Sequence, residues 1–139
     1  MVVDVHELVA PLDDPSQVRR AGLDYWESVN PTIYKDWDDF LEHGPQGQRL
    51  LFTKYGSESL LDVDFAAIPP EENIVLVFGN EECGLTDIKE RIQDERLCGL
   101  PMLNTDIFRS FNLSTSASIA LWEAYSQITR QARVPNDAK

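Results

Sequence analysis

The chain has 139 residues, 42% of them hydrophobic, and its 24 Asp and Glu residues outnumber its 12 Lys and Arg residues, for a formal net charge of −12. This length and composition fit a single domain, residues 1–139, with a core of its own. The acidic balance excludes the broad basic surface that nucleic-acid-binding proteins usually present, and it leaves only local groups of cations for phosphate contacts.

Hydrophobic periodicity and helix-start signals predict four elements in the first half of the chain. Asp14 followed by Pro15 is typical of the start of a helix. Apolar residues at helical spacing, with acidic residues opposite, predict an amphipathic helix packed on a sheet. In chain order we expect a strand at 2–9, a helix from Asp14 to within 22–25, the amphipathic helix at 33–42 with Ile33, Trp37, Phe40 and Leu41 on its apolar side, and a strand at 49–55 stopped by Gly56.

The second half begins with a stretch, residues 57–71, that holds only weak turn signals. A continuous apolar run then predicts a strand covered on both faces, because the run is too short for a helix of its own. In chain order we expect this strand at 74–78, a short helix capped by Thr86 and carrying Ile88 and Ile92, a strand at 97–102, and a long final helix. Strands that alternate with helices predict an α/β domain with a mainly parallel sheet.

The final helix has two apolar faces rather than one. The first face carries Ala117, Ala120, Leu121, Ala124 and Ile128, and the second carries Ile119 and Trp122. Two apolar faces exceed what one sheet can cover, so we predict a subunit interface on this helix. The alternative is a helix buried within its own domain.

Targeting and metal-binding signals are weak in this sequence. We expect neither a membrane span nor a secretory signal, since the chain shows no apolar run of about 18 residues and no charged leader, and therefore a cytoplasmic protein. The two cysteines, Cys83 and Cys98, form no CxxC motif, and His6 and His43 are isolated. This pattern predicts no metal site and no disulfide, and it predicts that Cys98 is a small core residue.

Two polar loops lie next to buried elements. Residues 79–84 follow the apolar strand at 74–78 and contain glycine and acid, whereas Asn112, Ser114, Thr115 and Ser116 precede or begin the final helix. Such serine, threonine and asparagine residues can simply cap the helix. They can also form a ligand site, because polar loops at the ends of parallel strands are the usual binding place in an α/β sheet.

These two loops resemble motifs of the SPOUT methyltransferases, a family of knotted RNA-modifying enzymes. The family forms Phe-Gly-x-Glu-x-x-Gly-Leu and Pro-Met…Arg-Ser-x-Asn-Leu-Ser stand here at residues 78–85, 101–102 and 109–114. The segment at 19–25 is similar to one in the branch that methylates the ribose 2′-hydroxyl at the tRNA wobble position. The resemblance implies an α/β knot with a C-terminal trefoil knot over about residues 74–120, the cofactor S-adenosylmethionine, a tRNA or other structured RNA as partner, and a homodimer formed through the C-terminal helix.

The resemblance also implies roles for individual residues. The cofactor pocket would be formed by Phe52, Thr53, Gly79, Leu100, Met102, Ser110 and Leu113. The residues implied near methyl transfer are Ser110 and Asn112 for positioning, Arg109 for the RNA phosphate or hydroxyl, and Glu81 for holding the loops together or for a purely structural role. The arginines implied in RNA binding are Arg19 and Arg20, which can equally form a solvated helix face.

The sequence departs from the family pattern in three ways, of which one is that residues 104–108 make the loop between Pro-Met and Arg-Ser about two residues longer than usual. It lacks the opening strand and helix with the motif Pro-x-Asn-x-Gly-x-x-x-Arg, whose arginine is thought to activate the ribose hydroxyl, so relative to the family it reads as N-terminally truncated. Trp122 stands where the most similar family members carry tyrosine. Two hypotheses therefore remain: an RNA ribose 2′-O-methyltransferase, and a catalytically inactive SPOUT-fold protein that binds or assembles RNA or ribonucleoprotein.

Overall fold

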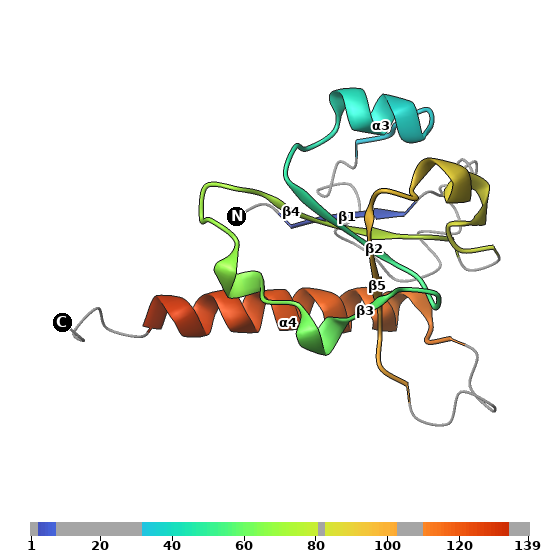
Figure 1. The fold of residues 1–139 in the computed structure, drawn as a ribbon. Helices are drawn as coiled ribbons and strands as arrows, with labels where there is room; N and C mark the ends of the chain where they lie inside the picture. The colour runs from blue at the N-terminus through green and yellow to red at the C-terminus, as the bar shows by residue number, and fades with distance from the viewer. Residues whose placement is uncertain (1–2, 8–31, 81–82, 103–109, 134–139) are drawn as a thin grey trace, which may run out of the picture.

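The computed structural model describes residues 3–7, 32–80, 83–102 and 110–133, and the predicted helix at 14–25 lies outside these ranges. The secondary structure alternates between strands and helices along the chain (Figure 1). The elements are β1 (Val3–Glu7), α3 (Trp37–His43), β2 (Gln48–Phe52), β3 (Glu58–Ser59), the 3-10 helices η1 (Leu60–Asp62) and η2 (Phe65–Ala67), β4 (Ile74–Phe78), the 3-10 helix η3 (Thr86–Arg91), β5 (Arg96–Gly99) and α4 (Leu113–Arg133).

The five strands form one sheet in the order β1-β4-β2-β5-β3, and every described pair is parallel. Strand β2 therefore lies between β4 and β5, although both follow it in the sequence. The register pairs Phe52 with Phe78 and with Cys98, so these strands end at the same edge of the sheet. The parallel α/β architecture expected from the sequence is confirmed.

Helices cover both faces of the sheet, because the side chains of β4 alternate between two cores. Ile74, Leu76 and Phe78 pack in one core with Ala120 and Ala124 of α4. Val75 and Val77 pack in the other with residues of α3 and η3, which lie on the opposite side of the sheet (Figure 1). All five residues of β4 are buried, as the apolar run predicted.

One side chain of α4 connects this helix to the segment between β3 and β4. The Gln127 amide oxygen accepts a hydrogen bond from Phe65 N at 2.8 Å, and its Nε2 donates to Val63 O at 3.0 Å. Because Phe65 and Val63 are buried, Gln127 satisfies backbone groups that would otherwise be left without a partner. This pairing fixes η2 against α4.

Helix α3 is shorter than predicted, because it begins at Trp37 rather than at Ile33. Asp36 is its N-cap and accepts a hydrogen bond from Asp39 N at 3.0 Å, which satisfies an N–H group of the first turn. Ile33 lies before this cap and is 83% exposed, so its placement on the buried face was wrong. Trp37 and Phe40 are buried as predicted.

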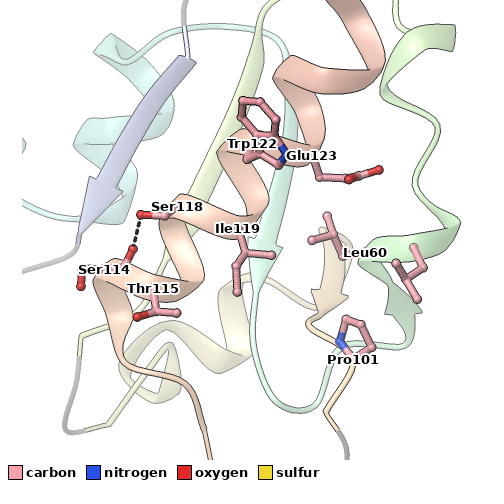
Figure 2. Close-up of a pocket in the computed structure, with 9 residues that line it drawn as sticks. Leu60, Pro101, Ser114, Thr115, Ser118, Ile119, Trp122 and Glu123 are labelled. Atoms are coloured by element: carbon pink, nitrogen blue, oxygen red, sulfur yellow. Dashed lines mark hydrogen bonds between the residues drawn. The ribbon is translucent and has the colours of Figure 1, made fainter. Parts of the chain in front are cut away.

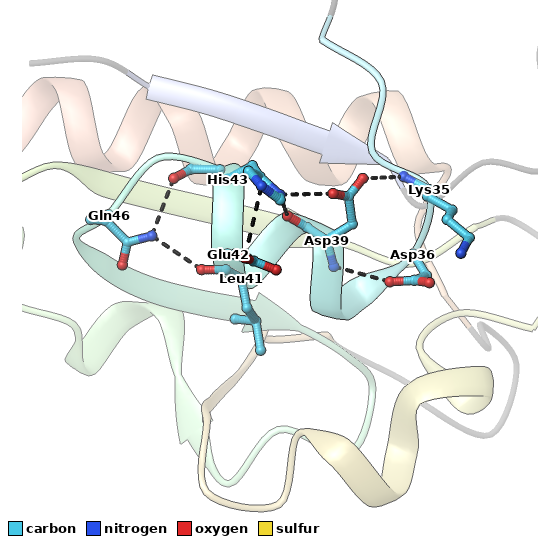
Figure 3. Close-up of polar contacts among 8 residues, drawn as sticks. Lys35, Asp36, Asp39, Leu41, Glu42, His43 and Gln46 are labelled. Carbon is cyan, nitrogen blue, oxygen red and sulfur yellow. Dashed lines mark hydrogen bonds and ion pairs between the residues drawn. The ribbon is translucent and has the colours of Figure 1, made fainter.

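The last turn of α3 carries an exposed ion pair (Figure 3). His43 Nδ1 lies 2.8 Å from Asp39 Oδ1, one helical turn away, and this contact raises the pKa of His43. A cation near a helix C-terminus is also favoured by the helix dipole. His43 therefore has a local structural partner in Asp39.

Several other boundaries differ from the predictions. Strand β2 ends at Phe52 instead of residue 55, and β5 ends at Gly99 instead of residue 102. The stretch 57–71 forms β3, η1 and η2 rather than turns alone. Thr86 does not cap η3, since its hydroxyl donates back to Cys83 O at 2.6 Å and the cap position is Leu85. Within the described ranges, no helix has the length and apolar character needed to cross a membrane.

Candidate functional site

The candidate site lies at the edge of the sheet where β2, β4 and β5 end. Phe52 and Phe78 are register partners there, and their rings stack with centroids 4.7 Å apart and an interplanar angle of 11°. Both rings are buried in the core beneath α4. They form a rigid apolar base from which the loops after the strands leave the sheet.

The loop after β2 is a tight turn at residues 53–56. Thr53 N donates to Cys98 O at 3.0 Å, so the turn is attached to β5. Gly56 N donates back to Thr53 O at 3.1 Å, and Tyr55 N donates to the Thr53 hydroxyl at 3.3 Å. Gly56 packs so closely on β5 that a Cβ at this position would overlap the backbone of Cys98. Thr53 is thus fixed at the edge of the sheet where a cofactor role was predicted.

The loop after β4 is held by its own backbone. Asn80 and Gly84 form an isolated bridge, in which Gly84 N donates to Asn80 O at 3.0 Å and Gly84 has a φ of +63°. The Asn80 amide oxygen also accepts from Cys83 N at 2.7 Å. A Cβ on Gly79 would overlap the backbone of Gly84, so glycine is required at this position for loop closure. Gly79 therefore has a structural role, and the approach of a cofactor to this residue stays a prediction.

The segment after β5 carries two predicted cofactor residues. Leu100 is half-buried and packs against the core under α4, and Met102 is also half-buried. Apart from strand pairing, the backbone groups of these two residues form no hydrogen bond to any residue that the structure describes. The predicted contact of these main-chain groups with an adenine ring stays a prediction.

The start of α4 shows how the serine-rich loop is used. The Asn112 side-chain oxygen accepts from Ser114 N at 2.9 Å and from the Ser114 hydroxyl at 2.5 Å, and Asn112 O accepts from Ser116 N at 2.9 Å. Asn112 thus caps the helix, as one of the two sequence interpretations proposed. Ser110 is exposed in front of this cap, and Leu113 packs against the same core as Leu100.

The structure brings only some of the predicted site residues together. Phe52, Leu100 and Leu113 share one core cluster, and Gly79 follows Phe78 of that cluster. Ser110 and Asn112 lie at the exposed start of α4. The predicted residues that fall outside the described ranges are Arg19, Arg20, Glu81 and Arg109.

A groove of about 500 Å³ lies between α4 and the segments after β3 and β5 (Figure 2). Ile119 of α4 lies across this groove from Leu60 and Pro101, while Trp122 and Glu123 line one end (Figure 2). Hydroxyl groups also line it, contributed by Ser114, Thr115 and Ser118. Leu60 and Leu61 were not predicted as lining residues, because the stretch 57–71 has no strong hydrophobic periodicity. The two adjacent leucines were the only sign in this stretch that it contributes to an apolar surface.

Glu58, Arg96 and Cys98, which lie near this edge, have structural roles. Arg96 donates to both carboxylate oxygens of Glu58, at 2.6 and 2.5 Å, and these bonds hold the pKa of Glu58 below its usual value. Burial raises the pKa of the Cys98 thiol to about 11, so it stays protonated at neutral pH and is a core residue as predicted. Among the described residues, no three His, Cys, Asp or Glu side chains are grouped to hold a metal ion.

Comparison with known proteins identifies similar sequences over most of the chain. A family model described as SpoU rRNA Methylase family matches residues 2–122. A tRNA (cytidine(34)-2′-O)-methyltransferase from Burkholderia ambifaria is 37% identical over 126 residues, which cover 88% of this chain and 76% of that protein. A Listeria innocua protein provisionally given the same activity is 37% identical over 123 residues, covering 86% and 70% of the two chains.

Solved structures share the same fold. A structure described in terms of 2-OH methylation of C/U34 on tRNA is 32% identical, has a TM-score of 0.72, and is matched over 92% of this chain and 78% of that one. A Bacillus anthracis protein provisionally described as an RNA methyltransferase is 34% identical with a TM-score of 0.71, over 88% and 77% of the two chains.

Proposed function

The chain belongs to the SpoU rRNA methylase family, within the SPOUT class of α/β methyltransferases, and from this premise we propose that it methylates the ribose 2′-hydroxyl of a tRNA wobble nucleotide with S-adenosylmethionine as methyl donor. The observation that carries the proposal is the 37% identity, over 86–88% of this chain, to proteins named as tRNA (cytidine(34)-2′-O)-methyltransferases. These relatives favour an enzyme over a non-catalytic RNA-binding protein.

The cofactor site that we propose is the edge formed by Thr53, Gly79 and the segment from Leu100 to Met102. When bound there, S-adenosylmethionine supplies an electrophilic methyl group on a sulfonium. In this site the main-chain groups of Leu100 and Met102 would contact the adenine ring. The stacked Phe52 and Phe78 make the floor of this edge rigid, which limits the cost of ordering the site on binding.

The residues proposed to position the ribose belong to the start of α4 and the loop before it. A ribose hydroxyl is a weak nucleophile until its proton is removed or its developing charge is stabilised. Ser110 is exposed at this point and can contact the RNA, whereas the Asn112 oxygen is engaged in the helix cap. Arg109 and Glu81 keep their predicted roles in phosphate or hydroxyl contact and in loop closure.

We further propose that the protein is a homodimer whose interface includes α4. An exposed apolar strip on α4 supports this, formed by Ile119, Leu121, Trp122 and Tyr125. Leu121 was predicted to share a face with Ala120 and Ala124, but it is exposed and belongs to the strip, whereas the two alanines are buried. A contiguous exposed apolar surface next to an apolar groove is typical of a protein interface.

We also propose that residues 74–120 form a trefoil knot. The placement of β2 between β4 and β5 supports this proposal.

The function is tested with two measurements on the same preparation. Calorimetric titration with S-adenosylhomocysteine should show micromolar binding, and tritiated S-adenosylmethionine should label a tRNA transcript that carries cytidine 34. A matched transcript with 2′-deoxycytidine at position 34 should not be labelled, because it lacks the acceptor hydroxyl. A folded protein that binds the cofactor product but labels neither transcript at any position would contradict the proposed activity.

A further inference from the structure

The turn after β2, which begins at Thr53 of the proposed cofactor site, carries a residue with an exposed aromatic ring. Tyr55 follows Thr53 by two residues and is 77% exposed, although a tyrosine ring gains free energy from burial. Trp122, also largely exposed, belongs to the α4 strip that the proposed dimer would cover. Tyr55 lies in the turn after β2 and is not part of this strip, so the proposed dimer does not account for its exposure.

The ring is presented by backbone that is held in place on both sides. Thr53 N is bound to Cys98 O, Gly56 N is bound to Thr53 O, and Gly56 packs directly against the β5 backbone. A ring on such a turn loses little conformational freedom when it binds a ligand. The turn also lies close to the segment that leads to Leu100, because Thr53 O would be in van der Waals contact, 3.7 Å, with a Cβ on Gly99.

A cation accompanies the ring. Lys54 Nζ lies 4.9 Å from the centroid of the Tyr55 ring, and Lys54 forms no ion pair with any residue in the described part of the chain. By contrast, Arg49, Arg91 and Arg96 are each paired with a carboxylate. The described cations without a carboxylate partner also include Lys35, Lys89, Arg130 and Arg133. Among these, Lys54 is the one in the turn that begins at Thr53, where its charge is available to a phosphate.

We propose that the turn at 53–56 is an RNA-binding element, in which Tyr55 stacks on an unpaired base of the tRNA anticodon loop and Lys54 contacts a neighbouring phosphate. Single-stranded loops are recognised mainly by stacking of splayed bases on aromatic side chains, and cations alongside track the backbone. The inference rests on the proposed function. It adds a substrate contact that lies on a different loop from the start of α4.

The test uses a fluorescein-labelled RNA anticodon stem-loop and the 139-residue chain. Tyr55→Ala should weaken RNA binding by about 5- to 150-fold in fluorescence anisotropy, the range expected when a stacking aromatic is removed. Tyr55→Phe should stay within about twofold of the wild type, because a phenyl ring also stacks. Calorimetric affinity for S-adenosylhomocysteine should be the same in all three proteins, since the ring is not part of the cofactor site. Lys54→Gln should reduce the slope of log Kd against log salt by about 0.7, the change expected for one lost phosphate contact on single-stranded RNA.

Equal RNA affinities for the wild type and Tyr55→Ala, with both proteins folded, would overturn the proposal. The same holds if Tyr55→Phe binds as weakly as Tyr55→Ala, because the hydroxyl rather than the ring would then be responsible. Failure of the proposed function is distinguishable, because the wild type would then label no tRNA transcript with a methyl group, whatever the relative RNA affinities of the variants.

Discussion

Phe52 and Phe78 occupy equivalent positions on neighbouring parallel strands, and their rings stack face to face at 4.7 Å. Each ring immediately precedes a loop of the candidate site, the turn at 53–56 in one case and the loop that starts at Gly79 in the other. The contact between the two rings therefore fixes where both loops begin, and both loops would contact the same ligand.

Removal of one of these rings should lower the stability of the fold. Phe78→Ala should lower the free energy of unfolding by about 3–5 kcal/mol, the usual cost of deleting a fully buried phenylalanine. Urea unfolding followed by circular dichroism measures this change. Ile33→Ala is the matched control: its side chain is 83% exposed, so we expect a change within about 0.5 kcal/mol. Equal effects of the two substitutions would contradict the packing described for β4.

The helix cap at Asn112 can be separated from a role in methyl transfer. Asn112→Ala removes the acceptor for Ser114 N and should lower the free energy of unfolding by about 1 kcal/mol. Asn112→Asp keeps a capping oxygen, so its stability should match the wild type. If the amide also positions the ribose, Asn112→Asp should lower kcat for tRNA methylation at unchanged stability. An Asp variant with full activity would leave Asn112 with the structural role alone.

The elements that could be predicted from sequence are those whose signal is local. The apolar run at 74–78 specifies a strand buried on both faces without reference to any other segment, and the structure confirms it. Helix α4 was equally clear from its apolar spacing. The start of α3 was misplaced because Ile33 lies one helical turn before Trp37 and so extends the apolar spacing, whereas the structure shows that Asp36 caps the helix.

The elements that could not be predicted depend on distant partners. Strand β3 has two residues and exists because it pairs with β5, where Glu58 binds Arg96 38 positions away. The groove joins Leu60 and Leu61 to Ile119 and Trp122, which no local pattern connects. In the site, the sequence could not show that Gly79 is required by contact with Gly84, because that contact depends on how the loop folds back on itself.

The two glycines of the loop after β4 should respond differently to the same substitution. Gly84 has a left-handed φ of +63° and open space around its missing Cβ, so Gly84→Ala should cost only the backbone strain of about 1–2 kcal/mol. At Gly79 an added methyl overlaps backbone that cannot rotate away, so Gly79→Ala should lower the free energy of unfolding further. Thermal unfolding of the two variants compares them directly. If Gly79→Ala proved the milder change, the loop closure described here would be wrong.

The ion pair between Glu58 and Arg96 should make stability depend on pH in the acidic range. The bonds from Arg96 lower the folded-state pKa of Glu58, whereas the unfolded value is about 4.3. A depressed carboxyl pKa contributes stability that is complete above the unfolded value and is lost as the pH falls through the folded value. The wild type should therefore be more stable than Glu58→Gln at neutral pH, and the difference should shrink below about pH 4. Urea titrations from pH 3 to pH 7 follow this difference, and a gap that stays constant across the range would exclude the ion pair as its source.

The apolar strip on α4 should control the oligomeric state. Trp122 is 65% exposed and contacts Tyr125, with ring centroids 6.1 Å apart, so a charge at position 122 would be placed at the centre of the strip. Trp122→Glu should convert a dimer into a monomer in sedimentation velocity, because burying an unpaired carboxylate in an interface is strongly unfavourable. Gln131→Glu adds the same charge on the exposed last turns of α4, outside the strip, and should leave the dimer intact. Unchanged circular dichroism would show that α4 still folds in both variants. A wild-type chain that sediments as a monomer at micromolar concentration would contradict the dimer proposal, and the exposed strip would then have to bind a different partner.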